Sequence, residues 1–411
     1  MLHLKSSTRD IETSRLLPYG RHFIDEDDIA AVVRVLTGDT LTTGPMAPAF
    51  EAALANYVGA KHAIVCSSGT AALHLAARAL GLGPGDTVIV PAITFLATAN
   101  AARLVGAEVV FADVDPDTGL MGPDHLNAAI ADLPRSGKRA LFNVHFAGQC
   151  EDPESIARIA REAGLKIVDD ACHAIGTEHR DSSGRWHKLG GCAYADLTVF
   201  SFHPVKTIAM GEGGAISTND AALADRLRRD RNHGVERDPS KLRQNFSRDL
   251  SGAIAPWAYE MAEPGLNYRA SDIHCALGLS QLGKLPRFIR ERRQLASAYD
   301  RALDPLWPTI RPLGRCTSCL PAWHLYVALI DFARLGLTRG EAMAALKQQG
   351  IGSQVHYIPV ARQPHYEDRY GVADLPGADL YSRSCLSLPL FVGMTEDDVT
   401  RVTNAIANLA R

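Results

Sequence analysis

Three observations in the sequence predict an α/β fold. It has a mostly parallel sheet in a large domain and a smaller α+β domain after it. Roughly the first 230 residues alternate short apolar runs with helix-like segments. The apolar runs are continuous, as expected of strands that are covered on both faces. Beyond about residue 265, the chain mixes strand-like and helix-like patterns in another order.

The first helix is predicted just after an acidic stretch at residues 25–28, because Ile29, Val32, Val33 and Leu36 recur at helical spacing. The strands of the sheet are then expected at residues 62–66, 87–92, 107–114, 140–146, 165–170 and 197–202. Ligands of such sheets bind at the carboxyl ends of the strands. The chemistry is therefore expected where these runs end.

The second half of the chain begins with a long polar, irregular stretch at residues 234–265, typical of an exposed excursion. Helices are expected at 271–304, 338–350 and 395–410, and strands at 324–330 and 353–358. We therefore divide the chain into an N-terminal extension (1–16) that we expect to be flexible, a large domain (17–265) and a small C-terminal domain (266–411).

Composition excludes several classes of partner. The 411 residues are 46% hydrophobic and 22% charged, with a formal net charge of −3. No run of lysine and arginine points to nucleic acid, and no apolar stretch is long enough to cross a membrane. The N-terminus lacks the apolar core of a secretion signal, so we expect a cytoplasmic protein.

The cysteines do not predict a disulfide framework. Eight of them are spread along the chain, mostly in apolar surroundings, which favours reduced and buried thiols. Cys316 and Cys319 form one C-x-x-C pair, but no second pair stands at zinc-like spacing. We expect no metal site there and interpret the pair as part of a loop.

The segment "CSSGTAALHLAARAL" predicts an anion site. It leads from a strand through Ser67, Ser68, Gly69 and Thr70 into an alanine-rich helix. Free N–H groups, hydroxyls and the positive end of a helix together suit a phosphate. An ordinary helix cap is the competing interpretation.

An acidic pair follows another apolar run, in "KIVDDACHAIG". Asp169 and Asp170 end a strand that is expected to be buried, where a carboxylate needs a partner. A cationic ring nitrogen would be such a partner, although the pair could also cap a following helix.

Lys206 completes a set of three features. A lysine beside a phosphate site and a buried carboxylate is suited to a Schiff base with pyridoxal 5'-phosphate (PLP), and to proton transfer once its amine is free. Gly211, Gly213 and Gly214 would let the backbone turn close to the cofactor. By itself, a lysine after a strand is usually a surface cation.

Four segments carry a resemblance: "SSGTAALHLA", "DDACHAIGT", "FSFHPVKTI" with "GEGGAI", and "GLNYRASDIHCALGLSQL". In order and spacing they resemble the DegT/DnrJ/EryC1/StrS family of PLP-dependent nucleotide-sugar aminotransferases. The resemblance covers about residues 18–411 and implies fold type I of the PLP-dependent transferases, the aspartate aminotransferase-like fold.

The resemblance implies a role for several residues. Lys206 would form the Schiff base and Asp170 would pair with the pyridine nitrogen. Thr70 and Ala71 would bind the phosphate, with Ser201 as a further contact.

Further positions also match the family. Phe95 stands where the family stacks an aromatic ring on the cofactor; from the residues alone it would be a core aromatic. His173 stands where members carry His or Gln beside the ring oxygen. Asn267 and Arg269 match the segment that reaches the phosphate of a neighbouring subunit, which implies a homodimer with composite sites.

For the substrate, the matched segments contain Tyr19, Arg21, Thr43, His356 and Tyr357. The closest likeness is to the branch of the family that moves an amino group from L-glutamate to C4 of a UDP-4-keto-6-deoxy-N-acetylhexosamine. Its product, UDP-4-amino-4,6-dideoxy-N-acetyl-β-L-altrosamine, belongs to pseudaminic acid biosynthesis. Ala209 and Met210 depart from the family, which often has threonines there.

Four other functions can be compared with the features of the sequence. Another nucleotide-sugar 3- or 4-aminotransferase, acting on a dTDP- or GDP-linked sugar, stays open. A PLP-dependent sugar dehydratase has histidine at the position of Lys206, which argues against it. The glycines of "GLGPGD" precede a strand, which does not suit a nicotinamide-binding turn. A non-catalytic regulator that binds PLP or a sugar nucleotide would have no need for this lysine.

Overall fold

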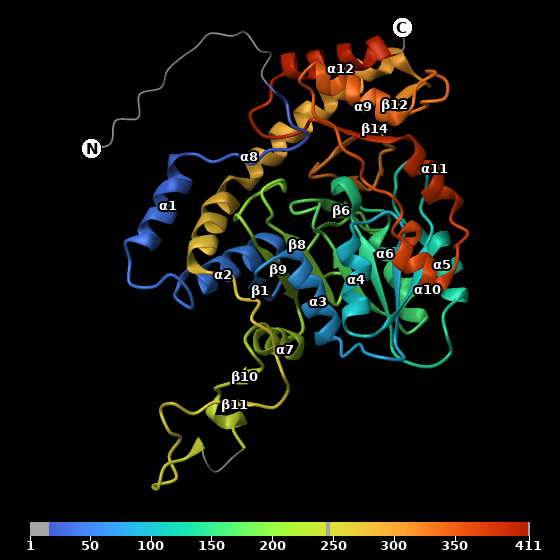
Figure 1. Ribbon diagram of the computed structural model, residues 1–411. Coiled ribbons are helices and arrows are strands. Elements are labelled where there is room, and N and C mark those ends of the chain that lie inside the picture. The colour runs from blue at the N-terminus through green and yellow to red at the C-terminus, as the bar shows by residue number, and fades with distance from the viewer. Residues whose placement is uncertain (1–15, 244–246, 410–411) are drawn as a thin grey trace.

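The computed structural model describes residues 16–243 and 247–409 (Figure 1). The predicted N-terminal extension, except its last residue, lies outside these ranges. Within them, no helix is both long enough and apolar enough to cross a membrane.

A central sheet forms the body of the large domain. Within the described ranges it has seven strands in the order β1-β9-β8-β5-β4-β2-β3. Their bounds are β1 (His62–Cys66), β2 (Thr87–Pro91), β3 (Glu108–Ala112), β4 (Arg139–Val144), β5 (Lys166–Asp170), β8 (Leu197–Ser201) and β9 (Gly214–Thr218). Neighbours from β8 to β3 pair in parallel, whereas β9 is antiparallel to both β8 and β1. The predicted, mostly parallel sheet is confirmed; β9 was not predicted.

Helices cover both faces of this sheet. Alternate residues of one strand enter different apolar clusters: Val88 and Val90 of β2 pack on one face and Ile89 on the other. The first cluster includes α3 (Gly69–Ala79), α4 (Leu96–Leu104) and α7 (Ala221–Arg231), and the second α5 (Pro123–Ala131) and α6 (Pro153–Glu162). Strands that are buried on both faces appear in a sequence as continuous apolar runs, as they do here.

The long helix α8 (Asp272–Leu303) belongs to the segment predicted as the small domain, but it begins beside helices of the predicted large domain (Figure 1). Its first half packs against α1 (Glu26–Leu36) and α2 (Met46–Val58). The predicted apolar face of α1 does not provide this contact, because Ile29, Val33 and Leu36 are exposed. The side of α1 that is buried carries Ala31, Val35 and Asp28 instead, and the Asp28 carboxylate accepts hydrogen bonds from Ser280 and Gln281 of α8.

The small domain holds a sheet of β12 (Ile310–Pro312), β14 (Tyr326–Ile330) and β15 (Cys385–Leu388). Its helices are α9 (Arg339–Gln348), α10 (Pro364–Tyr370), α11 (Pro376–Ser384) and α12 (Glu396–Leu409). The strand predicted at 353–358 is wrong, since only a single bridge joins Gln354 to Ser387. After this bridge the segment turns away from the sheet, and His356 and Tyr357 line the cavity that also holds Lys206. The strand that pairs with β14 at this edge is β15.

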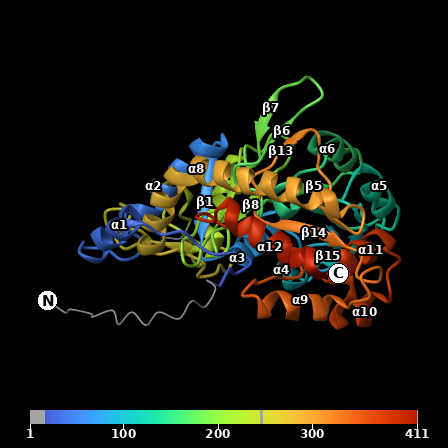
Figure 2. The ribbon, with the colours of Figure 1, turned by 90° about the horizontal axis from the view of Figure 1, so that it is seen from above.

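Two smaller sheets complete the chain. The hairpin of β6 (Glu178–Arg180) and β7 (Trp186–Lys188) pairs with β13 (Cys319–Leu320) and stands out from the body in Figure 2. The polar excursion holds β10 (Val235–Glu236) and β11 (Glu260–Met261) and projects below the body in Figure 1. Short 3-10 turns lie at Phe146–Gly148, Pro239–Lys241, Asp304–Leu306 and Val360–Arg362.

All eight cysteines are free, and six of them are buried. Cys316 lies beside an acid, with Sγ 3.0 Å from Glu151 Oε2. Across the described part of the chain, no three His, Cys, Asp or Glu side chains are grouped as metal ligands would be.

Candidate active site

A cavity of about 1030 Å³ opens at the carboxyl ends of β1, β5 and β8. The segments around it come from far apart in the sequence, from Tyr19 near the start to Gln363 in the small domain. Its lining includes Ser67, Ser68 and Gly69 of the predicted anion site and eight of the residues that the resemblance assigns to the cofactor or the substrate: Tyr19, Thr70, Phe95, Asp170, Ser201, Lys206, His356 and Tyr357.

The start of α3 forms the anion-binding end of the cavity. Ser68 caps the helix, its Oγ accepting from the Ala71 N–H at 3.0 Å. The cap interpretation is therefore correct, and it leaves the N–H groups of Gly69 and Thr70 without an acceptor in the helix. The predicted phosphate ligand Ala71 is buried and does not line the cavity, and its N–H is used in the cap. A positive helix end with free N–H groups can hold a phosphate.

Space at this end is too tight for larger residues. A Cβ built on Gly69 would lie 2.8 Å from Ser201 Cβ, and one on Gly214 would lie 2.2 Å from the Ser68 carbonyl oxygen. Real Cβ atoms do not come so close to other atoms. The glycines therefore let β8, β9 and the start of α3 approach one another around the cavity.

Asp170 supplies the acid. Its side chain is buried, with Oδ2 accepting from Thr98 Oγ1 at 2.7 Å and Oδ1 from the Cys172 N–H at 3.1 Å. Asp169 belongs to the other side of the strand, where its Oδ1 lies 3.1 Å from His145 Nε2. No helix begins directly after the pair, so helix capping is wrong for both.

Lys206 lies on the connection between β8 and β9, and its Nζ is 3.5 Å from His324 Nε2. Burial lowers the pKa of Lys206, while the nearby Cys172 and Asp170 act in the opposite direction. A lysine with a lowered pKa has more of its amine in the neutral, nucleophilic form. The surface interpretation of this lysine is wrong.

The side chains of His324, His356 and Tyr357 line another part of the cavity, and the buried His173, which does not line it, contacts Tyr357. Tyr357 Oη lies 3.2 Å from His173 Nε2, and the rings of His173 and His324 are 4.4 Å apart. Burial lowers the pKa of both histidines well below the usual value, with the charge of Lys206 as the next cause. Burial also lowers the pKa of His356 to about 3. These rings are neutral near pH 7.

Phe95 stands at the mouth of the cavity. It precedes α4, and 55% of its side chain is exposed. Its ring centroid is 6.2 Å from that of Tyr357. Phe95 is therefore not a core aromatic, and its exposed ring is free to stack on a ligand.

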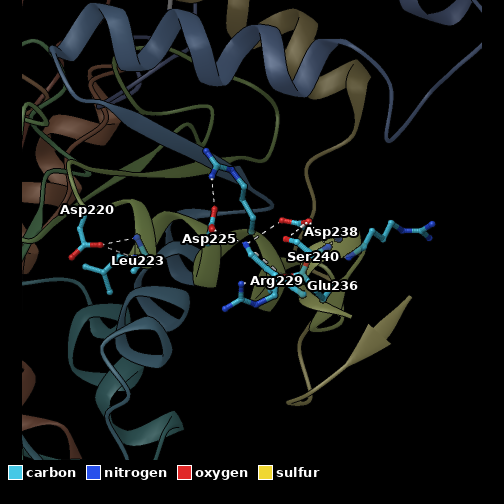
Figure 3. Close-up of polar contacts among 11 residues, drawn as sticks. Asp220, Leu223, Asp225, Arg229, Glu236, Asp238 and Ser240 are labelled. Carbon is cyan, nitrogen blue, oxygen red and sulfur yellow. Dashed lines mark hydrogen bonds and ion pairs between the residues drawn. The ribbon is translucent and has the colours of Figure 1, made fainter. Parts of the chain in front are cut away.

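Other predicted residues lie elsewhere. Thr43 and Arg269 line a second hollow of about 380 Å³ between α7 and β10, and Asn267 pairs with Asn232 nearby. Arg21 is exposed and does not line the Lys206 cavity. The region around the second hollow is rich in ion pairs, as Figure 3 shows, such as that of Arg229 with Glu236 at 3.5 Å.

Comparison with known proteins matches this geometry to one family. The model of the DegT/DnrJ/EryC1/StrS aminotransferase family matches residues 22–407. The chain belongs to this family. It is similar to the Helicobacter pylori aminotransferase PseC, which is involved in the biosynthesis of pseudaminic acid, at 29% identity and a TM-score of 0.85, over 96% of this chain and 99% of that one.

Two further structures are similar to this aminotransferase. DesI, crystallised in the presence of its TDP-sugar product, is 30% identical, with a TM-score of 0.81 over 96% of this chain and 93% of that one. The PLP form of Spr1654 from Streptococcus pneumoniae is 25% identical, with a TM-score of 0.83 over 96% and 98% of the two chains. The chain is thus a sugar aminotransferase with fold type I of the PLP-dependent transferases, as the sequence predicted.

The sequence reasoning missed two residues of this aminotransferase. Thr98, which holds Asp170, stands inside an ordinary helical stretch. His324, which contacts Lys206, was counted as part of the strand that begins at Tyr326. One feature of the sequence could have indicated His324: it is a polar residue that stands just before an apolar run.

Proposed function

We propose that this aminotransferase uses PLP to move an amino group from L-glutamate to C4 of a UDP-linked 4-keto-6-deoxy-N-acetylhexosamine. The observation that carries the proposal is the meeting of Lys206, Asp170 and the start of α3 in one cavity, although 136 residues separate Thr70 from Lys206 in the sequence. Such a meeting of amine, acid and anion site suits PLP.

The residues fit this cofactor on three counts. The start of α3 offers N–H donors to a phosphate in a space that larger residues would close. Asp170 offers a buried carboxylate to a ring nitrogen, and Phe95 offers an exposed ring face. When bound, PLP supplies an aldehyde that condenses with amines and a ring that accepts electrons.

Side chains of the protein would bind the cofactor and transfer the protons. Asp170, held by Thr98, would pair with the ring nitrogen and favour its protonated form. The neutral amine of Lys206 takes a proton from the amino donor and gives one to the sugar carbon C4. Thr70 and Ser201 would hold the phosphate. His173, whose Nε2 contacts Tyr357 Oη and whose Nδ1 accepts from the Ala147 N–H, would act beside the ring through Tyr357.

A homodimer is part of the proposal. In a single chain, Asn267, Arg269 and Thr43 lie away from the Lys206 cavity, so they would serve the site of a second subunit. The exposed apolar side chains of α1 give such a subunit a surface to cover: Ile29 is 56% exposed, Val33 47% and Leu36 54%. Exposed apolar patches of this kind are typical of protein interfaces.

The sugar is chosen on the likeness to PseC, and Tyr19, His356 and Tyr357 are the cavity residues proposed to contact it. A second candidate is a dTDP-linked sugar, favoured by the likeness to DesI. Both candidates share the aminotransferase chemistry and differ in the nucleotide.

The test is to supply the purified protein with PLP, L-glutamate and a panel of UDP-, dTDP- and GDP-linked 3-keto and 4-keto sugars, and to follow amino sugars by mass spectrometry. We expect turnover of the UDP-4-keto sugar. Turnover confined to a dTDP sugar would overturn the sugar assignment alone. Failure of borohydride to fix the cofactor on Lys206 would overturn the proposed site.

A matched pair of variants tests the lysine. Lys206→Ala is expected to lower turnover by at least about 10³-fold, because one group supplies both the nucleophile and the proton carrier. Lys166→Ala, at an exposed lysine whose Nζ is 3.0 Å from Asp196 Oδ1, should retain normal turnover.

A further inference from the structure

His324 reaches Lys206 from the small domain. It precedes β14, it is 4% exposed, and its Nε2 lies 3.5 Å from Lys206 Nζ. Throughout residues 16–243 and 247–409, no other side chain forms a hydrogen bond with this amine.

The backbone of His324 is held firmly. Its N–H donates to the Ala147 carbonyl at 3.0 Å, which ties the segment to the large domain. The buried guanidinium of Arg292 donates to the carbonyl oxygens of His324 at 3.3 Å and Leu390 at 2.9 Å. The ring therefore has a fixed position relative to Lys206.

The ring itself is free to change its tautomer. His324 Nδ1 is buried and has no hydrogen-bond partner among the described residues. A histidine whose tautomer is fixed usually has a second partner on its other nitrogen. With Nε2 as the acceptor, the ring receives a hydrogen bond from the ammonium form of Lys206; with the proton on Nε2, it donates to the neutral amine.

Other charged or titratable groups face the pair from several elements. Asp170 ends β5 and Cys172 follows it, Lys206 itself follows β8, and His173 and His356 lie beside the ring of His324. Arg292 of α8 lies behind it. Asp170 accepts from Thr98 and from the Cys172 N–H and forms no hydrogen bond with the lysine, whereas His324 Nε2 lies within hydrogen-bond distance of Nζ.

We propose that His324 is a positioning residue that holds the free amine of Lys206 and stabilises its ammonium form between taking up a proton and releasing it. This rests on the proposed function, in which Lys206 carries a proton. A buried ammonium without an acceptor would lose its proton too readily and would be a poor acid toward the sugar carbon.

The role can be measured without turnover. In protein freed of PLP, the pH dependence of Lys206 acylation by a small amine-reactive reagent, followed by peptide mass spectrometry, gives the midpoint of its ionisation. His324→Leu removes the acceptor and should move this midpoint downward by about one to two pH units, as expected for a hydrogen bond to a charged group. His324→Gln keeps an amide near the position of Nε2 and should restore most of the midpoint.

The matched control is His179→Leu. His179 is likewise a buried histidine with an unpartnered Nδ1, but it lies on β6 and does not line the cavity. This variant should leave the midpoint unchanged. With PLP and substrates, His324→Leu should also lower kcat by about 10- to 100-fold, with His324→Gln less affected.

The midpoint decides the proposal even if no sugar is aminated, so its failure and that of the proposed function are distinguishable. A wild-type midpoint in His324→Leu would overturn it, as would an equal shift in His179→Leu. If His324→Leu does not fold, His324→Asn takes its place, because the shorter amide does not reach Lys206. A downward shift in His324→Asn, absent in His324→Gln, supports the proposal; equal midpoints refute it.

Discussion

Thr98→Val isolates the support that the structure gives to Asp170. The two side chains have nearly the same shape, so the change removes chiefly the hydroxyl. Thr98 is fully buried, and its Oγ1 lies 2.7 Å from Asp170 Oδ2 and 2.8 Å from Thr94 Oγ1. A hydrogen bond to a charged group contributes about 1.5–3 kcal/mol. The free energy of unfolding of the cofactor-free protein should fall by this amount.

Thermal denaturation can detect this loss. An unfolding entropy of about 2.1 cal/mol/K per residue means that each kcal/mol shifts the Tm of a chain of this length by about 1 °C. We therefore expect Tm to fall by about 2–3 °C. Thr403→Val is the matched control, since this buried hydroxyl donates only to carbonyls of its own helix, such as Val399 O at 3.0 Å. Its Tm should fall by about 1 °C or less.

Binding of PLP gives a second measurement on the same variants. If Asp170 pairs with the ring nitrogen, loss of Thr98 should raise the Kd for PLP by about tenfold, because the carboxylate is less firmly placed. Thr403→Val should leave Kd unchanged. Equal Tm and equal Kd in the two variants would show that the Thr98 hydroxyl does not support Asp170.

Three further predictions concern other parts of the chain. Asp28→Asn should lower the free energy of unfolding by about 3–5 kcal/mol in chemical denaturation, because this buried carboxylate contacts Ser280, Gln281 and Lys284 at 2.6–2.9 Å; an unchanged midpoint would contradict it. Burial lowers the pKa of His179 to about 4, so its contribution to stability is complete above about pH 6.5 and is lost at up to about 1.4 kcal/mol per pH unit as pH falls toward 4. His179→Leu should therefore flatten the dependence of Tm on pH in this window, and an identical slope would count against the assignment. Ile29→Asp with Val33→Asp should convert the proposed dimer to a monomer in light scattering, and a dimer that persists would exclude this face of α1 from the interface.

Much of the fold could be predicted because local patterns decided it. The continuous apolar runs at residues 62–66 and 87–91 are strands, since their residues pack on both faces of one sheet. By contrast, the sequence did not predict the strand β9, which begins at the last glycine of the run, Gly214. Its pairing with β1 and β8 is a long-range contact that no local pattern indicates. The strand predicted at 353–358 is wrong, because the segment contributes His356 and Tyr357 to the cavity and joins the sheet only by one bridge.

Some residues of the candidate site could also be predicted from the sequence, and others could not. Lys206, Asp170 and Thr70 could be found because each stands at the end of a strand or at the start of a helix. Thr98 and His324 could not, because their importance comes from a partner 72 and 118 residues away in the sequence. Likewise, the apolar spacing of α1 predicted the helix but not the direction in which its apolar side chains point.

The cavity also has a consequence for synthesis on the ribosome. Its lining begins at Tyr19 and ends at Gln363, so the first 300 residues contain the lysine, the acid and the anion turn but lack the His324 and Tyr357 wall. A nascent chain would therefore expose an unfinished pocket until the small domain emerges and docks.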